Sequence, residues 1–359
     1  MPGLIELTDG GIGCTVQDHG RTGHRHEGIP LSGCLDPRLA DAANALVDNA
    51  PGSACIEIRG VGPTLRVVDG PVRVAVAAHL GRRDAGQWLR ADGSRRPLPG
   101  WSSVTLAAGD VLRVGGPGDG GCAYLALSGG VQLPPHLGSR STYVPARLGG
   151  LDGRALAAGD RLPCASWPAQ RPHERRAATP PDGGGGPIRV VLGPQQGHFT
   201  AAAVETFLST GWIASAEQDR MGVRLQGPAL AHAGPGKADI VSDAVAPGAI
   251  QVPASGQPIV LLADCQTVGG YPKIATVIRA DLPRLAHARP GTTLHFAAVD
   301  AATARQALHA QRAQFQAWAA ALERVLPPAS LDEAALYTCN LVSGMIRGDA
   351  PEPGCQETR

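Results

Sequence analysis

The chain has 359 residues, of which 43% are hydrophobic and 18% charged, a composition typical of a globular protein with one large or two ordinary domains. Lysine and arginine total 32 and aspartate and glutamate 31, for a net charge of +1, which excludes the overall positive field of a nucleic-acid-binding protein. The only lysines are Lys237 and Lys273. Neither lies in a GxxxxGK[ST] sequence or beside a methionine, which excludes a P-loop ATPase site and a biotin attachment site.

The eight cysteines include no CxxC pair, which argues against a zinc ribbon or a thioredoxin-like redox motif. An even number of cysteines also occurs in disulfide-bonded secreted proteins. However, the N-terminal sequence MPGLIELTDGG has neither the basic nor the apolar part of a signal peptide. No apolar run approaches the ~18 residues of a membrane span. We therefore expect a cytoplasmic protein with reduced, mostly buried thiols and no contact with membranes.

Short strand-like segments dominate the chain. They are rich in Val, Ile and Leu and are bounded by Gly, Pro or Asp. They comprise residues 54–59, 64–68, 72–77, 103–106, 123–127, 188–192, 258–262 and 274–278. Turns of the type Ala-Ala-Gly-Asp precede strands at 107–112 and 157–162, and Arg-Pro-Gly-Thr-Thr-Leu at 289–294 is similar. This pattern is more typical of barrels or sandwiches than of alternating βαβ units.

Few helices are predicted. One begins at Asp36-Pro37, with Asp36 as N-cap and Pro37 in the first turn, and a second follows Thr200. The longest covers residues 300–326, is amphipathic and ends before Pro327-Pro328. Such a helix packs on its own barrel more often than it binds a partner.

The sequence between residues 171 and 187 is charged and rich in Gly and Pro, so we expect a linker there. The predicted organisation is an N-terminal β-rich domain (1–170), the linker (171–187), a C-terminal β-rich domain (188–326) that includes the long helix, and a C-terminal segment with a disordered tail (327–359). The fold class is mainly β (α+β).

A polar, glycine-rich segment at residues 15–36 contains three histidines and two arginines. Loops of this kind often line a functional site. The His24-x-His26 spacing could supply two metal ligands, but no third ligand has a telling spacing, so we predict no metal site. Asp36 has an ordinary structural explanation as a helix cap.

Four later segments present polar groups beside strands. Gln195 follows a Gly-Pro turn, where its side chain either forms hydrogen bonds in a functional site or is simply exposed to solvent. Arg220 and Arg224 are four apart, and on a strand they would share a face and could hold a carboxylate. Alternatively, Arg220 pairs with Asp219 or Asp243 and braces its loop. Asp243 is a candidate base or amide-binding group, or simply a turn residue, and Gln251 begins the next strand.

The segment from 258 to 278 has the most functional groups. A buried strand leads to Asp264, and Gly269, Gly270, Tyr271 and Lys273 follow before the next strand. The two glycines allow backbone N–H groups to approach a ligand. A lysine retained in an arginine-rich chain suggests that a compact ammonium group is needed, although a solvated lysine in a tight loop would have the same sequence.

These segments, in this order, resemble the biotin-dependent carboxyltransferase or allophanate hydrolase subunit 2 family, which includes KipA and the C-type subunits of 5-oxoprolinase. The resemblance extends from residue 4 to about 346, and the most distinctive stretches are TVQDHGRTGHRHEGIPLSGCLD, LGPQQGHF, SDAVAPGAIQVPASGQPIVLLADCQTVGGYPKIATVI and NLVSG. The family's DRMG motif matches residues 219–222, its SDG motif Ser242-Asp243, and its TGGYPK loop residues 267–273. Ala244 replaces the usual glycine, Cys265 the usual arginine and Val268 the usual threonine.

The resemblance implies two cyclophilin-like β-barrel domains and a role as the C-type subunit of an ATP-dependent 5-oxoprolinase, which converts 5-oxoproline to glutamate. Its partners would be a KipI-like B subunit and an A-type subunit. No cofactor would be bound covalently, and the complex would use ATP. The alternatives are the carboxyltransferase half of a biotin-dependent urea or amide carboxylase, with carboxybiotin on a separate carrier, and a KipA-type regulatory protein.

For a small amide or lactam, the site needs an N–H acceptor, donors to the carbonyl oxygen and a cation for a substrate carboxylate. The expected catalytic residues are Asp243, Lys273 and Arg220. The expected substrate-binding residues are Gln195, Gln251, Asp264, Thr267, Gly269, Gly270, Tyr271 and Arg224.

Overall fold

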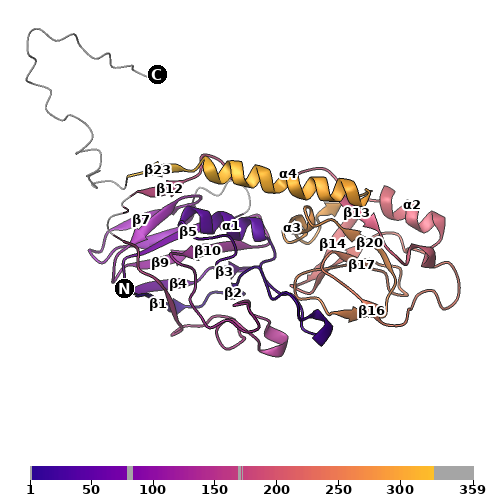
Figure 1. Ribbon diagram of the computed structural model, residues 1–359, viewed down its shortest axis with the longest axis horizontal. Helices are drawn as coiled ribbons and strands as arrows, with labels where there is room; N and C mark the ends of the chain where they lie inside the picture. The colour runs from indigo at the N-terminus through magenta and orange to yellow at the C-terminus, as the bar shows by residue number, and fades with distance from the viewer. Residues whose placement is uncertain (1, 79–83, 169–170, 172, 327–359) are drawn as a thin grey trace, which may run out of the picture.

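The computed structural model describes residues 2–78, 84–168, 171 and 173–326. Within these residues the chain is mainly β with few helices, which confirms the predicted fold class (Figure 1). The C-terminal segment from residue 327, including the NLVSG stretch and the predicted disordered tail, lies outside the described residues.

The N-terminal unit consists of two antiparallel sheets with a core between them. One sheet has the order β11-β1-β4-β9-β6-β7 and the other β2-β3-β10-β5-β8. These strands are β1 (Pro2–Asp9), β2 (Cys14–Gln17), β3 (Cys55–Ile58), β4 (Thr64–Asp69), β5 (Val72–Ala78), β6 (Asp84–Leu89), β7 (Arg95–Pro99), β8 (Ser103–Leu106), β9 (Val111–Val114), β10 (Ala123–Leu127) and β11 (Arg161–Ala165).

Strand β5 is buried on both faces. Val74 and Val76 face the core between the sheets, whereas the small side chains of Ala75 and Ala77 face helix α1 (Pro37–Leu46). The predicted cap of α1 is confirmed, because the Asp36 carboxylate accepts hydrogen bonds from the backbone N–H groups of Arg38 and Leu39.

The second unit is a nearly closed barrel of eight strands in the order β21-β14-β15-β18-β17-β20-β13-β22. They are β13 (Ile188–Leu192), β14 (Trp212–Gln218), β15 (Gly222–Gln226), β17 (Ala249–Gln251), β18 (Ile259–Leu261), β20 (Lys273–Val277), β21 (Thr293–Leu294) and β22 (Phe296–Ala298). Strands β21 and β22 lie at opposite ends of this order, yet only His295 separates them in the chain. The sheet must therefore curl until its first and last strands meet.

A two-stranded ribbon of β16 (Asp243–Ala244) and β19 (Val268–Gly269) accompanies the barrel. Helix α2 (Ala201–Ser209) begins at Thr200, whose hydroxyl accepts a hydrogen bond from the N–H of Ala203, and α3 (Leu282–Leu285) is short. Single 3-10 turns occupy η1 (Arg25–Glu27), η2 (Val144–Ala146) and η3 (Gln196–His198).

The long helix α4 (Ala301–Ala320) runs along both units (Figure 1). Near its end, Trp318 contacts Trp101 of the N-terminal unit edge-to-face, with 6.1 Å between ring centroids. The helix is shorter than the predicted 300–326, because residues 323–325 form strand β23 (Glu323–Val325) against β12 (Glu174–Arg176). The predicted linker thus contains a strand, and the helical spacing of Leu322 and Val325 made the helix look longer than it is.

Candidate functional site

Three of the predicted site residues come together at one end of the barrel. The Lys273 ammonium lies 2.7 Å from an Asp243 carboxylate oxygen and donates a second hydrogen bond, of 3.1 Å, to the Ala244 carbonyl. The Gln195 amide donates to the same Asp243 oxygen at 3.1 Å. Lys273 is 4% exposed, whereas the Asp243 side chain is 49% exposed. The cluster therefore presents a carboxylate to solvent and keeps its counter-ion buried beneath.

The hydrogen bond from Lys273 is the largest influence on Asp243 and lowers the pKa of this carboxyl, with further help from the Ala244 N–H and from Gln195. Asp243 is thus ionised at neutral pH and suited to accept a hydrogen bond from an N–H or O–H group. Ala244, which replaces the glycine usual in the resembling family, has no positive φ, so this strand does not require glycine there.

The β16–β19 ribbon joins this cluster to a cavity. Asp243 pairs with Gly269 across the ribbon, and a Cβ at Gly269 would lie 2.5 Å from the Gln251 side-chain amide. Gly269 therefore allows close packing against Gln251, whereas a Cβ at Gly270 would make only ordinary contacts, the nearest at 3.6 Å from the Ile240 carbonyl oxygen. Thr267 is buried, and its carbonyl accepts a hydrogen bond from Val245, which fixes the base of the ribbon.

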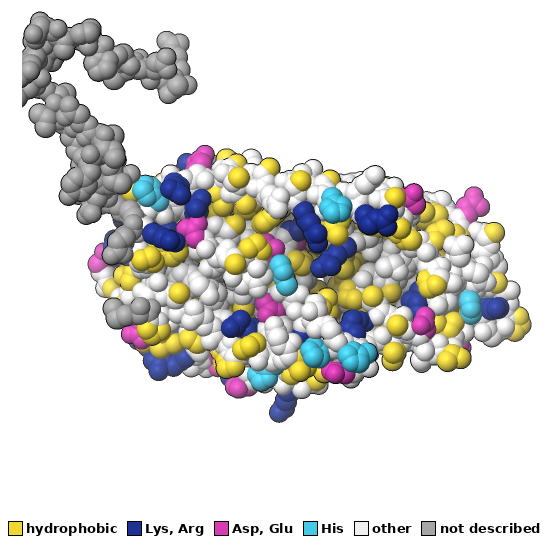
Figure 2. Space-filling view, viewed as in Figure 1, with side chains coloured by type: hydrophobic (Ala, Val, Ile, Leu, Met, Phe, Trp, Pro, Cys, Tyr) yellow, Lys and Arg dark blue, Asp and Glu magenta, His cyan; other side chains and the backbone are white. Residues whose placement is uncertain are grey.

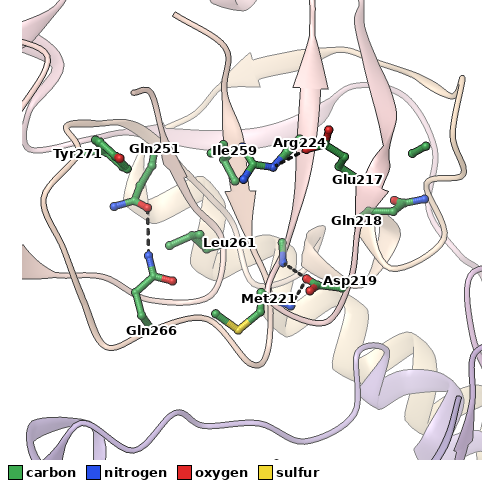
Figure 3. A pocket seen from close by; sticks show the side chains of 12 residues that line it. Glu217, Gln218, Asp219, Met221, Arg224, Gln251, Ile259, Leu261, Gln266 and Tyr271 are labelled. Atoms are coloured by element: carbon green, nitrogen blue, oxygen red, sulfur yellow. Dashed lines mark hydrogen bonds and ion pairs between the residues drawn. The ribbon is translucent and has the colours of Figure 1, made fainter. Parts of the chain in front are cut away.

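The cavity measures about 520 Å³ and opens between the β14–β15 turn and the loop before β20 (Figure 3). Met221, Ile259 and Leu261 form its apolar part. Its polar lining residues are Glu217, Gln218, Asp219, Arg224, Gln251, Gln266 and Tyr271. A hydrogen bond of 3.3 Å joins the Gln266 amide to the Gln251 oxygen, and Arg224 pairs with Glu217 at 3.1 Å. This mixed lining suits a small polar ligand.

Arg220 lies elsewhere, in a buried network between the two units. Its guanidinium makes two hydrogen bonds to Asp264, at 2.8 and 3.0 Å, and one of 2.5 Å to Glu57 of strand β3. Burial alone would lower the pKa of Arg220, but Glu57 and Asp264 outweigh burial and raise it. Tyr124 donates a further hydrogen bond to Glu57 at 2.7 Å. Arg220 and Asp264 thus neutralise each other and brace the interface of the two units.

The expectation that Arg220 and Arg224 share a strand face is therefore wrong. Arg220 precedes β15, in a turn where Asp219 accepts hydrogen bonds from the N–H groups of Met221 and Gly222. The Arg220 guanidinium forms ion pairs with the Glu57 and Asp264 carboxylates, whereas Arg224 is exposed at the cavity. The alternative pairing of Arg220 with Asp219 or Asp243 is also wrong, because the partners of Arg220 are Glu57 and Asp264. Removing a charged group from water raises the free energy of the folded state unless a counter-ion is near, which explains why Arg220 pairs with carboxylates.

The segment 15–36 contacts the barrel unit at several points: the Ser32 N–H donates a hydrogen bond to the Ala263 carbonyl oxygen, and the Arg220 guanidinium donates one to the Gly33 carbonyl oxygen. Arg25 donates hydrogen bonds to the carbonyl oxygens of Val245 and, at 3.3 Å, Gln266. His24 instead pairs with Glu27 at 2.9 Å. In the parts of the chain that the structure describes, no group of three or more His, Cys, Asp or Glu side chains could hold a metal ion.

Gln266 and Glu57 are the residues that sequence reasoning missed. Gln266 lies two positions after Asp264, inside the segment richest in functional groups, so its position was a usable signal. Glu57 occupies an apolar strand pattern, where a buried carboxylate itself indicates a partner of opposite charge.

The six cysteines within the described ranges are unpaired and buried: Cys14, Cys34, Cys55, Cys122, Cys164 and Cys265. Burial raises the pKa of Cys265 to about 11 despite the nearby Arg25, so this thiol is not activated as a nucleophile. None of the helices in the described ranges has the length and apolar character needed to cross a membrane.

Comparison with known proteins identifies the family. Residues 27–298 match the model of the carboxyltransferase domain, subdomains A and B. The chain belongs to this carboxyltransferase family. It is 35% identical to the C-type subunit of 5-oxoprolinase from Escherichia coli over 88% of this chain and 98% of that protein. The protein of the same description from Haemophilus influenzae is also 35% identical, over 82% of this chain and 91% of its own length.

Larger relatives of this carboxyltransferase family contain the fold as one part. The solved urea carboxylase of Kluyveromyces lactis superposes with a TM-score of 0.75 at 27% identity, over 88% of this chain but 29% of that one. The urea amidolyase of Lachancea kluyveri is 28% identical over 88% of this chain and 18% of its own. The present chain thus corresponds to nearly the full length of the bacterial proteins and to a portion of the fungal enzymes.

Proposed function

We propose that this chain is the C-type subunit of an ATP-dependent 5-oxoprolinase and acts in a complex with a KipI-like B subunit and an A-type subunit. The observation that carries the proposal is correspondence over nearly the whole length of two C-type 5-oxoprolinase subunits at 35% identity. The Asp243–Lys273–Gln195 cluster beside the cavity supports it, because a lactam needs an ionised acceptor held close to polar donors.

In this proposal Asp243 is the catalytic residue that contacts the substrate. Its ionised carboxylate accepts the ring N–H, and Lys273 and Gln195 fix its position and charge state. Backbone N–H groups near Gly269 and Gly270 face the carbonyl oxygen. Arg224, whose own partner Glu217 is exposed, takes the substrate carboxylate in place of Arg220. Gln251 and Tyr271 line the remaining wall, while Thr267 and Asp264 support it from behind.

The chemistry opens one ring. The lactam C–N bond breaks, water supplies the oxygen that completes the new carboxylate, and the ring nitrogen leaves as the amine of glutamate. Hydrolysis of ATP to ADP and phosphate is coupled to this step in the complex. This chain needs no covalently bound cofactor for its part, and the ATP site belongs to the partners or to the surface shared with them.

Reconstitution with the A-type and B-type proteins of the same genome tests the proposal. The assay measures phosphate release that depends on 5-oxoproline, together with glutamate formation. We expect release only with all three chains, and a loss of about 100-fold or more with Asp243→Asn or Lys273→Met. Glu205→Gln, on the exposed surface of α2, is the control and retains activity.

A second candidate is the carboxyltransferase half of a biotin-dependent urea or amide carboxylase. The TM-score of 0.75 with a urea carboxylase favours it. The Asp243 cluster would then face the ureido ring of carboxybiotin carried by a separate protein. A stable complex with the B-type chain that turns over no 5-oxoproline, but carboxylates urea with a biotin carrier, would replace the first proposal with this one. Absence of both activities would favour a KipA-type regulatory role.

A further inference from the structure

A second cavity, of about 470 Å³, lies on the N-terminal unit, away from the Asp243 cluster. Among the described residues, Arg171, His173, Arg175 and Arg324 line it together with the acidic Asp48. Figure 2 shows dark blue, cyan and magenta side chains gathered at the end of the molecule where Figure 1 places β12 and β23. Among these described lining residues, three guanidinium groups accompany one carboxylate.

The two faces of the two-stranded β12–β23 ribbon carry different charge pairs. Arg176 lies directly opposite Glu323, and the two form an ion pair of 2.7 Å. One position along, on the other face, Arg175 lies directly opposite Arg324. Like charges directly opposite in an antiparallel pair are destabilising. The ribbon thus has a matched charge pair on one face and a mismatched pair on the face that lines the cavity.

The cations of this cavity are only partly neutralised. Asp48 pairs with Arg175 at 2.8 Å. In the part of the chain that the structure describes, no carboxylate lies within ion-pair distance of Arg171 or Arg324. Glu174 does not compensate, because it points to the opposite face of the strand, where it accepts a hydrogen bond from the Thr105 N–H. Two exposed guanidinium groups remain available to an external anion.

Hydrogen bonds hold the backbone that carries Arg171, His173 and Arg175. The carbonyl oxygens of Arg171 and His173 both accept hydrogen bonds from Arg73, which is 1% exposed. The Arg73 guanidinium also stacks on Trp167, 3.9 Å from the ring centroid. Trp167 donates a further hydrogen bond, of 2.7 Å, to the Arg171 carbonyl. The backbone that carries Arg171, His173 and Arg175 is therefore held in place before any ligand arrives.

We propose that this cavity binds a phosphate chain, as in pyrophosphate, tripolyphosphate or a nucleoside triphosphate. Guanidinium groups recognise phosphate with two parallel hydrogen bonds, and several of them suit a multiply charged anion. A phosphate placed between Arg175 and Arg324 would turn their repulsion into a shared attraction. The site is independent of the proposed lactam chemistry and would stand if that proposal failed.

The test is isothermal titration of the full chain with phosphate, pyrophosphate, tripolyphosphate and ATP at low ionic strength. We expect pyrophosphate to bind more tightly than phosphate, and binding to weaken as salt is added. Equal affinity for tripolyphosphate and ATP identifies the phosphate chain as the ligand. Tighter binding of ATP shows that the nucleoside is recognised as well.

Paired variants separate a built site from a diffuse positive surface. Replacing Arg171 and Arg324 by glutamine should weaken pyrophosphate binding about tenfold or more, because each removes a charged donor. Arg176→Gln removes the same charge from the other face of the ribbon and should leave the affinity within about twofold. Arg324→Glu should raise the melting temperature of the free protein, since it creates an opposite-charge pair with Arg175, and should abolish the response to pyrophosphate.

Three results would overturn the proposal. The first is no binding of any phosphate compound at millimolar concentration. The second is an equal loss of affinity in Arg176→Gln, which would mean that only overall charge matters. The third is binding of an acidic peptide with no binding of phosphate compounds, which would make the cavity a contact for an acidic protein segment.

Discussion

Arg220 and Lys273 are both largely enclosed cations paired with aspartate, with side chains 12% and 6% exposed, yet their surroundings differ. Arg220 is enclosed between two buried carboxylates, Glu57 and Asp264, from two different units of the molecule. Within the described residues Lys273 has one carboxylate partner, Asp243, and about half of the Asp243 side chain is exposed to solvent. A charge that is neutralised on all sides holds the structure together. Lys273, in contrast, holds a solvent-accessible carboxylate in place, and that carboxylate is free to contact a substrate.

Replacing the two cations by methionine is the strongest test of this difference. Arg220→Met removes the ion-pair partner of the buried Glu57 and Asp264, so we expect a loss of about 3–5 kcal/mol in the free energy of unfolding. Lys273→Met leaves a carboxylate that water can reach, and the loss should stay near or below ~1 kcal/mol. Urea denaturation followed by circular dichroism measures both values. Similar losses in the two variants would contradict the distinction.

Gly269 and Gly270, close to Lys273 in the chain, differ in the space available for a side chain. Gly269→Ala places a Cβ 2.5 Å from the buried Gln251 amide, and we expect a cost of about 1–3 kcal/mol from overpacking. Gly270→Ala meets its nearest atom at 3.6 Å and should change stability by less than ~0.5 kcal/mol. The same denaturation experiment compares them. Equal stabilities would show that Gln251 moves aside freely.

A smaller effect is expected from pH. Because Lys273 lowers the pKa of Asp243 in the folded protein, the pair stabilises the fold fully above the ordinary carboxyl pKa of about 4. This contribution disappears as the pH falls through the lowered value. The stability difference between wild type and Asp243→Asn should therefore be largest near neutral pH and shrink on acidification. A difference that does not change with pH would mean that the ion pair contributes nothing.

Local signals made parts of this molecule predictable from sequence. Asp36 and Pro37 mark the start of α1 because a helix cap depends on a few adjacent residues. The strand segments were recognisable because Val, Ile and Leu runs are bounded by turn residues. The grouping of Asp243, Lys273 and Gln195 came from the family resemblance, since no periodicity links segments so far apart.

Long-range pairings were not predictable. Arg220 is 163 residues from Glu57 and 44 from Asp264, and nothing near Arg220 in the sequence indicates either partner. The same holds for β12, which became a strand because β23 returns beside it after the long helix. A charged, Pro-rich sequence at 171–187 reads as a linker until its distant partner is known.

Because the chain through His295 joins the two ends of the sheet, the position of a chain break matters for the stability of the barrel. One short stretch, Thr293 to Ala298, hydrogen-bonds β14 at its start and β13 at its end. Cleavage at His295 would release two unpaired strand edges at once, and such edges favour self-association. New termini made by circular permutation should therefore be placed in the turns between other strands, where a break leaves the covalent link through His295 intact.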